Sequence, residues 1–514
     1  MRMLLACIVG ALSGYIALSY EILWVRVYNF ATEGRPESFG LLLAAYLAGL
    51  AAGSLFAGRL CDRAGAGQPK HCFWAGAFFV IANVAAFLAI PVSALLLGDW
   101  GRSTDWMLPV FGVAAAFLGV SFPLISHFAI PADQRAGARL SYVYVSNILG
   151  STLGSLVTGL WLLDVLSLRQ LNVILALSGA SIGALLMIIE TAKSRGRWII
   201  GGGLGVVAAV IVSTSAPLYF DLYERLLYKA DYVPGESFPI TIEGRSGVVS
   251  MTKSGAVYGS GSYDGQMNTS PLPHLDENRV LRAYLLPAFH PKPKEILIIG
   301  LGAGSWLQVL ANCPEIEHIT VIEINPGFVS IARHDPHVAS AITNSKVEIL
   351  IDDGRRFLTR TAKHFDVIVQ NTIVFWRGHA STLLSKEYLE LSRRHLKEGG
   401  VIYFNTTMST AAQKTGATVF PHALRFQNML IVGEQAINID RARFERLLNA
   451  WQIDGKAVLP PNLQAADLDL LAEQEWRGGS TWEDRASILA RTQDTPLITD
   501  DNMATEWWAW DTYP

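Results

Sequence analysis

Seven long apolar runs in the first 216 residues constrain the fold of this chain more than any other feature. Each is roughly 20 residues long, the length that an α-helix needs to cross a hydrocarbon core about 30 Å thick. Only 17% of the 514 residues are charged and 51% are hydrophobic. An average soluble domain is about 25% charged, so this balance predicts a multi-pass α-helical membrane bundle. The runs cover residues 4–24, 40–60, 73–97, 107–129, 140–163, 171–190 and 197–216.

The first run has an alternative interpretation as a secretory signal peptide. No small-residue cleavage site follows it and six more runs do, so the sequence favours a membrane span. Around its end, Glu21 and Arg26 flank an apolar stretch. Their charges are either compensated at a helix end or inside the bundle, or they form a polar site that faces a cavity. Gly150 and Gly154 form a GxxxG pattern, which favours close helix packing and hence a packed bundle rather than a pore.

Lysine and arginine are unevenly distributed over the loops between the runs. The loop after the first run holds two of these residues and the loops after the third and fifth runs hold one each, whereas the other three loops hold eight together. Because loops rich in Lys and Arg stay in the cytoplasm, seven spans would leave the C-terminal half outside the cell. The rich loops follow the second, fourth and sixth runs and hold Arg59, Arg63, Lys70, Arg135, Arg139, Lys193, Arg195 and Arg197; the others hold Arg26, Arg35, Arg102 and Arg169.

The composition becomes that of a soluble protein after residue 216. Residues 217–238 form an amphipathic connector. Residues 239–284 hold short β-type runs broken by Ser-Gly and Asp-Gly, which predicts a small β-hairpin sheet. An α/β domain follows at 285–450, and 451–514 form a C-terminal extension.

Apolar strands alternate with helical stretches through the predicted α/β domain. The strands are EILIIG, HITVIEIN, VEILIDDG, FDVIVQN and VIYFNTT, and the stretches between them end with YLELSRRHLKEGG. Strands that are apolar throughout are buried on both faces. The order therefore predicts a parallel sheet with helices on each side.

Three features at the ends of these strands indicate a nucleoside site. Gly300, Gly302 and Gly304 follow the first strand and open a helix, so the backbone can approach a ligand closely. Glu323 ends the second strand about 20 residues on, where an acid can hold both ribose hydroxyls. Asp353 follows the third strand. The chain has no GKS or GKT, which excludes a P-loop, and the lack of a phosphate-directed Lys or Arg disfavours NAD.

These motifs resemble the spermidine synthase (polyamine aminopropyltransferase) family. A hairpin sheet precedes HPKPKEILIIGLGAGS, VIEIN, DDGRRFL, FDVIVQN and LLSKEYLELSRRHLKEGGVIYFN. SGYIALSYEILWVRV, YVSNILGSTLGSL and TDDNMATE are similar to the membrane-fused branch of that family. The resemblance implies a Rossmann-like, methyltransferase-type fold and a transferase whose donor is S-adenosylmethionine or its decarboxylated form, with no metal.

The resemblance also assigns roles to residues of the nucleoside site. It implies that Glu323 holds the ribose and Asp353 the adenine side, and that the tail of the nucleoside runs along the three glycines. Asn268 falls where the family has a glutamine near the nucleoside.

The acceptor side departs from the family. Ala303 replaces an acid of the glycine loop, and NTIV replaces the loop whose two acids hold and deprotonate the amine, so Asn371 and Val374 stand for those acids. Asn371 accepts hydrogen bonds but no proton, which puts ordinary putrescine aminopropylation in doubt. The family's acidic stretch aligns loosely with His274–Asp276. The substitute catalytic candidates are His274, Asp276 and His379, each with an alternative as an ordinary loop residue.

The sequence leaves two functions open. One is a membrane-bound transferase of an aminopropyl, aminocarboxypropyl or methyl group to a polyamine, another amine or a lipid-like acceptor. The other is a membrane sensor or transport-associated protein that binds a nucleoside or polyamine without turnover. A net charge of −3 without a basic block gives no indication of nucleic acid, and a homodimer is one assembly left open. Adenosyl donors are cytosolic, so we favour a cytoplasmic soluble domain against the loop charges.

Overall fold

The computed structural model separates into two compact units, which are described one at a time. The first contains residues 1–33, 37–237 and 243–247, and the second contains 34–36, 238–242 and 248–514. The residues whose structure is described are 2–64, 71–131, 133–191, 194–272, 279–371, 376–463, 482–502 and 506.

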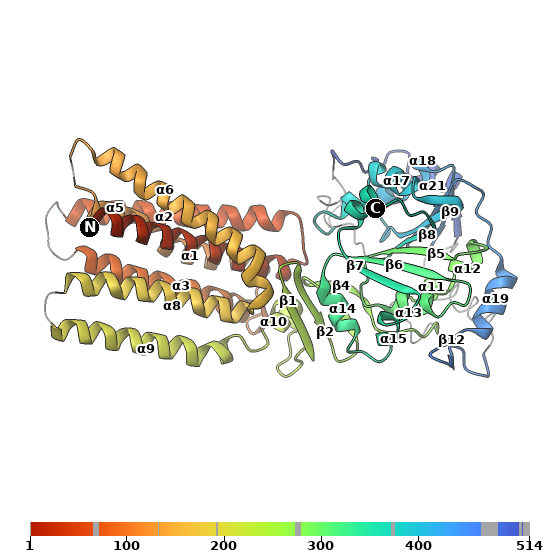
Figure 1. The fold of residues 1–514 in the computed structure, drawn as a ribbon, viewed down its shortest axis with the longest axis horizontal. Coiled ribbons are helices and arrows are strands. Elements are labelled where there is room, and N and C mark those ends of the chain that lie inside the picture. The colour runs from red at the N-terminus through yellow and green to blue at the C-terminus, as the bar shows by residue number, and fades with distance from the viewer. Residues whose placement is uncertain are drawn as a thin grey trace. The chain divides into compact units, whose positions relative to one another are not determined.

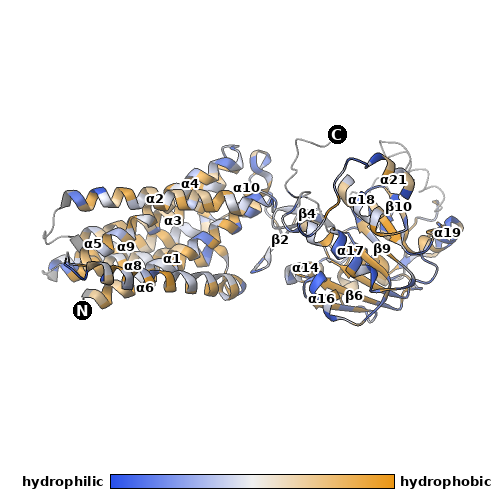
Figure 2. Cartoon of the chain, turned by 90° about the horizontal axis from the view of Figure 1, so that it is seen from above, coloured by the Kyte–Doolittle hydropathy of each residue, from blue (hydrophilic) through white to orange (hydrophobic). Residues whose placement is uncertain are grey.

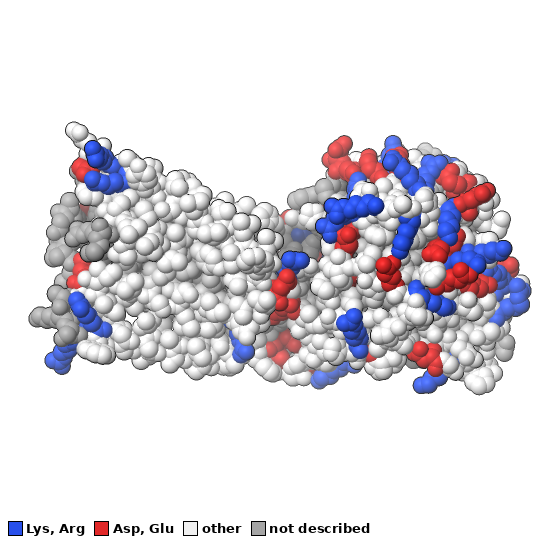
Figure 3. Space-filling view, viewed as in Figure 1, with Lys and Arg blue, Asp and Glu red and all other residues white. Residues whose placement is uncertain are grey.

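The first unit is a bundle of long helices (Figure 1). In the described part of the chain, seven helical stretches are long and apolar enough to cross a membrane, which confirms the predicted number. They are coloured mostly as hydrophobic (Figure 2) and show few charged side chains along their length (Figure 3). The helices are α1 (Arg2–Ala31), α2 (Glu37–Ala64), α3 (His71–Gly98), α4 (Met107–Gly119), α5 (Ser121–Ala129), α6 (Ala136–Val157), α7 (Leu163–Val165), α8 (Leu168–Glu190) and α9 (Ser194–Leu218).

Small residues set how closely α1 and α6 pack. A Cβ added at Gly150 would collide with the carbonyl of Ala11, and one added at Gly154 would collide with the carbonyl of Tyr15. The close approach predicted from the GxxxG pattern is therefore confirmed. Dispersion between bare backbones replaces the hydrophobic effect, which is absent between helices in lipid.

A small sheet opens the second unit. Among the described residues it has four strands in the order β1-β2-β3-β4, and the pairs β2–β3 and β3–β4 are antiparallel. This confirms the predicted hairpin sheet. The short helix α10 (Leu222–Tyr228) precedes it, and its strands are β1 (Ile240–Gly244), β2 (Gly247–Met251), β3 (Ala256–Gly259) and β4 (Ser262–Gln266).

The main sheet of the second unit is mixed. Its described strands have the order β14-β10-β11-β9-β8-β5-β6-β7. The five strands predicted from the sequence pair in parallel, and β11 and β10 extend the sheet by antiparallel pairing. The strands are β5 (Glu295–Ile299), β6 (His318–Glu323), β7 (Val347–Ile351), β8 (Phe365–Gln370), β9 (Leu396–Asn405), β10 (His422–Phe426), β11 (Met429–Gly433) and β14 (Trp482–Asp484).

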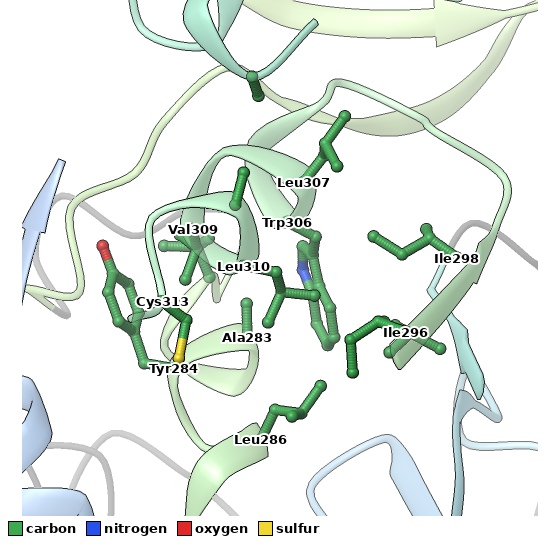
Figure 4. Close-up of a cluster of buried hydrophobic side chains, with 14 of the residues drawn as sticks. Ala283, Tyr284, Leu286, Ile296, Ile298, Trp306, Leu307, Val309, Leu310 and Cys313 are labelled. Atoms are coloured by element: carbon green, nitrogen blue, oxygen red, sulfur yellow. The ribbon is translucent and has the colours of Figure 1, made fainter. Parts of the chain in front are cut away.

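Helices cover both faces of this sheet, as the sequence predicts. Ile296 and Ile298 of β5 point into one hydrophobic cluster, in which Trp306 also packs (Figure 4). Leu297 and Ile299 point into a second cluster on the other face. The first face is covered by α11 (Leu281–Tyr284), α12 (Leu286–Phe289), α13 (Ser305–Ala311), α14 (Pro326–Ala332), α15 (Ala339–Ile342) and α19 (Arg441–Ala450), the second by α16 (Gly354–Arg360), α17 (Lys386–Arg393), α18 (Thr410–Val419) and α21 (Arg485–Arg491).

One boundary differs from the sequence prediction. The stretch YLELSRRHLKEGG is expected to be helical to its end, but α17 ends at Arg393 and β9 begins at Leu396. Leu396 pairs with Phe365 of β8 across a register shift, and Gly399 has a φ of 76°. Strand pairing that begins at Leu396 ends the helical pattern early, although Lys397 and Glu398 are good helix formers.

Candidate nucleoside-binding site

The candidate site lies at the carboxyl ends of the parallel strands. β5 lies between β6 and β8, so the strand order reverses at β5. Loops on the two sides of such a reversal diverge, and ligands of open α/β sheets bind in the space between them. The predicted nucleoside residues follow β5, β6 and β7, which are three neighbouring strands.

The glycine loop that leaves β5 has a backbone that other residues rarely adopt. The φ angles of Gly300, Gly302 and Gly304 are 83°, 55° and 83°. A Cβ in this region is strained, so glycine is needed at all three positions. The Gly300 amide donates to the carbonyl of Ile322 on β6 at 2.8 Å, and Gly304 is the N-cap of α13. Ala303 is buried within the loop.

Glu323, at the end of β6, connects the two neighbouring loops. One carboxylate oxygen accepts the Leu301 amide at 2.7 Å and the other accepts the Asn325 amide at 2.8 Å. The residue is 3% exposed, and burial raises the pKa of this carboxyl to about 7. A carboxylate has about four lone-pair sites, so two remain for the two hydroxyls of a ribose.

The next strand end combines a capping acid with apolar surface. Asp353 is the N-cap of α16, and its carboxylate accepts the Arg356 amide at 2.7 Å. Ile324, which follows Glu323, is 61% exposed, and Ile351, the register partner of Glu323, is 51% exposed. Exposed isoleucines beside two acids are suited to cover the face of a flat, polar-edged base.

Asn268 lies beside the glycine loop. Its amide nitrogen donates to the Ser305 hydroxyl at 3.3 Å, and Ser305 is the first residue of α13. Ser305 also donates to the carbonyl of Gln266. The segment that follows the small sheet is therefore hydrogen-bonded to the helix that the glycine loop opens, which places Asn268 beside that loop.

A buried ion pair that the sequence patterns do not reveal lies next to Glu323. Arg377 donates to Asp264 of β4 at 3.1 Å and to the carbonyl of Gly259. Asp264 is nearly fully buried, and burial raises its pKa although Arg377 opposes the rise. Both groups also act on Glu323, Asp264 raising its pKa and Arg377 lowering it. In the sequence, the Asp-Gly signal at Asp264 indicates only a hairpin turn.

The predicted acceptor residues are described only in part. Asn371 follows β8, and the side-chain amide of Asn405 donates to its carbonyl at 3.1 Å. His379 is exposed, with a φ of 69°. His274, Asp276 and Val374 lie outside the described residues. The structure thus places Asn371 at the same sheet edge as the nucleoside residues.

Metal-ligating side chains do not gather in the described part of the chain. Across residues 2–502, leaving out the stretches that are not described, no three His, Cys, Asp or Glu side chains lie where they could hold a metal ion.

Comparison with known proteins shows what this domain is similar to. A family model of the spermine/spermidine synthase domain matches residues 285–421. The chain is similar to a spermine/spermidine synthase domain over these matched residues. The match begins in the helices before β5 and ends after α18, so it contains the glycine loop, Glu323, Asp353 and Asn371.

The matching relatives share less than half of their length with the chain. A polyamine aminopropyltransferase of Agathobacter rectalis is 36% identical over 118 residues, which are 23% of this chain and 41% of the relative. A polyamine aminopropyltransferase of Streptococcus pneumoniae is 35% identical over 118 residues, which are 23% of this chain and 41% of the relative. A solved spermidine synthase from Thermotoga maritima is 20% identical and aligns with 46% of this chain and 86% of that one, at a TM-score of 0.33.

Proposed function

We propose that this protein is an integral membrane transferase that takes a group from an S-adenosyl-type donor. One observation supports this most directly: the glycine loop, Glu323 and Asp353 follow three neighbouring parallel strands. The match to the spermine/spermidine synthase domain model at residues 285–421 contains all of them. The transferred group is aminopropyl by family, or aminocarboxypropyl or methyl.

Each of these residues has a distinct task in holding the donor. Glu323 has two acceptor sites left for the ribose diol, and Asp353 lies on the adenine side. Ile324 and Ile351 cover the base with apolar surface. The three glycines let the sulfonium tail pass close to the backbone.

The transfer step requires a neutral acceptor and a place for its proton. The acceptor's lone pair forms a bond to the carbon next to the sulfonium as the carbon–sulfur bond breaks. The sulfur keeps the bonding electrons and leaves as a neutral thioether, which is methylthioadenosine when the aminopropyl chain moves. The acceptor's proton passes to a base. Asn371 cannot be that base, so we assign the task to His274, Asp276 or His379.

A second function is favoured by the same asparagine. The side-chain amide of Asn405 donates to the backbone carbonyl of Asn371 at 3.1 Å and to its side-chain oxygen at 3.5 Å, and Asn371 stands where the family has an ionisable group. An amide binds without taking a proton. A membrane sensor that binds a nucleoside or polyamine without turnover is therefore the alternative.

The two functions differ in whether nucleoside product appears. Purified full-length protein in detergent is incubated with S-adenosylmethionine or its decarboxylated form, with and without putrescine, and methylthioadenosine and S-adenosylhomocysteine are quantified. Release that is lost in Glu323→Gln supports the transferase. Binding of methylthioadenosine without any release supports the sensor, and neither binding nor release refutes both.

A further inference from the structure

The polar segment close to the C-terminus, Thr499–Glu506, is attached to the strand-end loops of the candidate site. Ile498, just before it, is buried in the hydrophobic cluster that contains α17 and α18. The Ile498 amide donates to the Thr415 hydroxyl, and its carbonyl accepts the Lys386 amide, both at 2.9 Å. The segment is thereby fixed to the same helices that cover the sheet. Its described residues are 499–502 and 506.

Asp500 holds the loop after β7. Its two carboxylate oxygens accept both terminal nitrogens of Arg355, one of them at 2.8 Å. The Ser385 hydroxyl donates to the same carboxylate at 2.7 Å. Arg355 is the second residue after Asp353, and it also donates to the carbonyl of Thr382 at 3.2 Å. The hydrogen bond from Arg355 keeps the pKa of Asp500 below its usual range.

Glu506 holds the loop after β8. Its carboxylate accepts the amides of His379 and Ser381, both at 2.8 Å, and the Ser381 hydroxyl. These amides begin the 3₁₀ helix η5 (Ala380–Leu383), whose N-cap His379 makes no side-chain cap. Free amides at a helix start need an acceptor, and here it comes from a residue far along the chain. Glu506 is 2% exposed.

The same loop is held on its other side by Arg377. This residue lies two positions before His379 and pairs with Asp264 and Gly259 of the small sheet. Residues 377–381 are thus fixed at two points, and this stretch follows Asn371 in the chain. Both the adenine-side acid and the acceptor-side loop depend on contacts with the C-terminal segment.

We propose that Asp500 and Glu506 are positioning residues, which hold the loops after β7 and β8 where donor and acceptor must meet. This assignment rests on the proposed function for what the loops bind. Asp500 acts through Arg355 on the loop that contains Asp353, and Glu506 acts on the loop that follows Asn371. The two carboxylates therefore affect different halves of the reaction.

The test compares Asp500→Asn, Glu506→Gln and a matched control in the full-length protein. Gln keeps the shape of Glu506 and one acceptor oxygen, so the fold is retained. The control is Glu434→Gln, which removes an exposed ion pair with Arg393. Glu434 follows the last residue of β11 and pairs with Arg393, which precedes β9, so it lies at the edge where the parallel strands begin, opposite the site.

Amide hydrogen exchange of peptides that cover residues 376–385 measures the anchoring directly. We expect exchange there to rise roughly 10- to 100-fold in Glu506→Gln, the equivalent of a hydrogen bond to a charged group at ~1.4 kcal/mol per tenfold. Glu434→Gln should leave these peptides unchanged. Unchanged exchange in Glu506→Gln overturns the proposal, whatever the activity.

Binding and turnover then separate positioning from general stability. Asp500→Asn should weaken methylthioadenosine binding about tenfold, whereas Glu506→Gln should lower turnover about tenfold and change that affinity less than threefold. Parallel loss of both quantities in both variants, or an equal loss in Glu434→Gln, overturns the positioning role. A wild-type protein that does not bind methylthioadenosine refutes the proposed function instead, and the exchange result still decides the anchoring.

Discussion

The substitution Glu323→Gln tests the nucleoside site through the pH dependence of a single carboxyl. Glutamine has nearly the same shape, but it cannot ionise and offers one acceptor oxygen instead of two. The Leu301 and Asn325 amides both need an acceptor at this position. The variant therefore loses the charge and one backbone contact while it keeps the volume.

The expected binding effect follows from the pKa of Glu323, which burial raises to about 7. The ionised carboxylate is the form that accepts two ribose hydroxyls. Wild-type affinity for methylthioadenosine should therefore rise about tenfold from pH 6 to pH 8, because the ionised fraction rises by that factor. In Glu323→Gln the affinity should be 10- to 100-fold weaker, about 1.5–3 kcal/mol for a charge-assisted hydrogen bond, and independent of pH.

The same pKa predicts an opposite trend in stability. A carboxyl whose pKa rises from 4.5 to about 7 on folding stabilises the protein below pH 4.5 and loses that contribution as the pH rises through 7. The loss between pH 5 and pH 8 is about 2–3 kcal/mol at 1.36 kcal/mol per pH unit. Glu323→Gln cannot ionise at this position and does not undergo this loss, so the variant should gain thermal stability relative to wild type as the pH rises.

Calorimetric titration with methylthioadenosine and thermal unfolding in detergent, each at pH 6, 7 and 8, measure both trends. Equal affinity in the two proteins at pH 8 would remove Glu323 from the site. An equal pH dependence in wild type and variant would assign the titration to another group and refute the reasoning from burial.

Three further predictions concern the acceptor, the donor and the membrane. Restoring the family's acids with Asn371→Asp and Val374→Asp should create or raise methylthioadenosine release with a diamine; normal nucleoside binding without any gain would show a more widely altered acceptor pocket. Ala303 and Val374 replace acids that would repel the carboxylate of S-adenosylmethionine, and such a repulsion costs about 4 kcal/mol per charge pair at 4 Å and a dielectric of 20. S-adenosylmethionine should therefore bind at least as well as its decarboxylated form. A tenfold preference for the decarboxylated form in side-by-side titration contradicts this. A reporter active only in the cytoplasm, fused after Pro514, should be active if the donor is cytosolic, and its inactivity would favour the placement that the loop charges indicate.

The elements with a strong pattern were predictable from the sequence. The apolar runs and the largely apolar β5–β9 strands indicate the spans and the parallel sheet, because buried segments are mostly apolar; the edge strand β7 is only partly buried. The antiparallel strands β10, β11 and β14 were missed, since their pairing is decided by neighbours distant in the chain. The nucleoside residues sit at strand ends that the topology brings together.

The contacts between distant side chains were not predictable. Arg377 reaches Asp264 across 113 positions and Glu506 reaches Ser381 across 125. No periodicity links such residues, and each alone is an ordinary surface charge in the sequence. Of these segments, only Thr499–Glu506 was noted in the sequence, because it is similar to the membrane-fused branch, and that similarity did not indicate what its side chains contact.

The placement of Glu506 has a consequence for how the protein is made. Chains emerge from the ribosome in order and their domains generally fold from the N-terminal side. The membrane helices precede every strand of the sheet, so they are available for insertion while the loop after β8 still lacks its acceptor for the His379 and Ser381 amides. A nascent chain that stops before residue 506 would have its apolar helices but would lack the carboxylate that accepts the His379 and Ser381 amides. Under the proposed function, the site is completed only after the apolar helices have been made, and a chain terminated before residue 506 should lack activity.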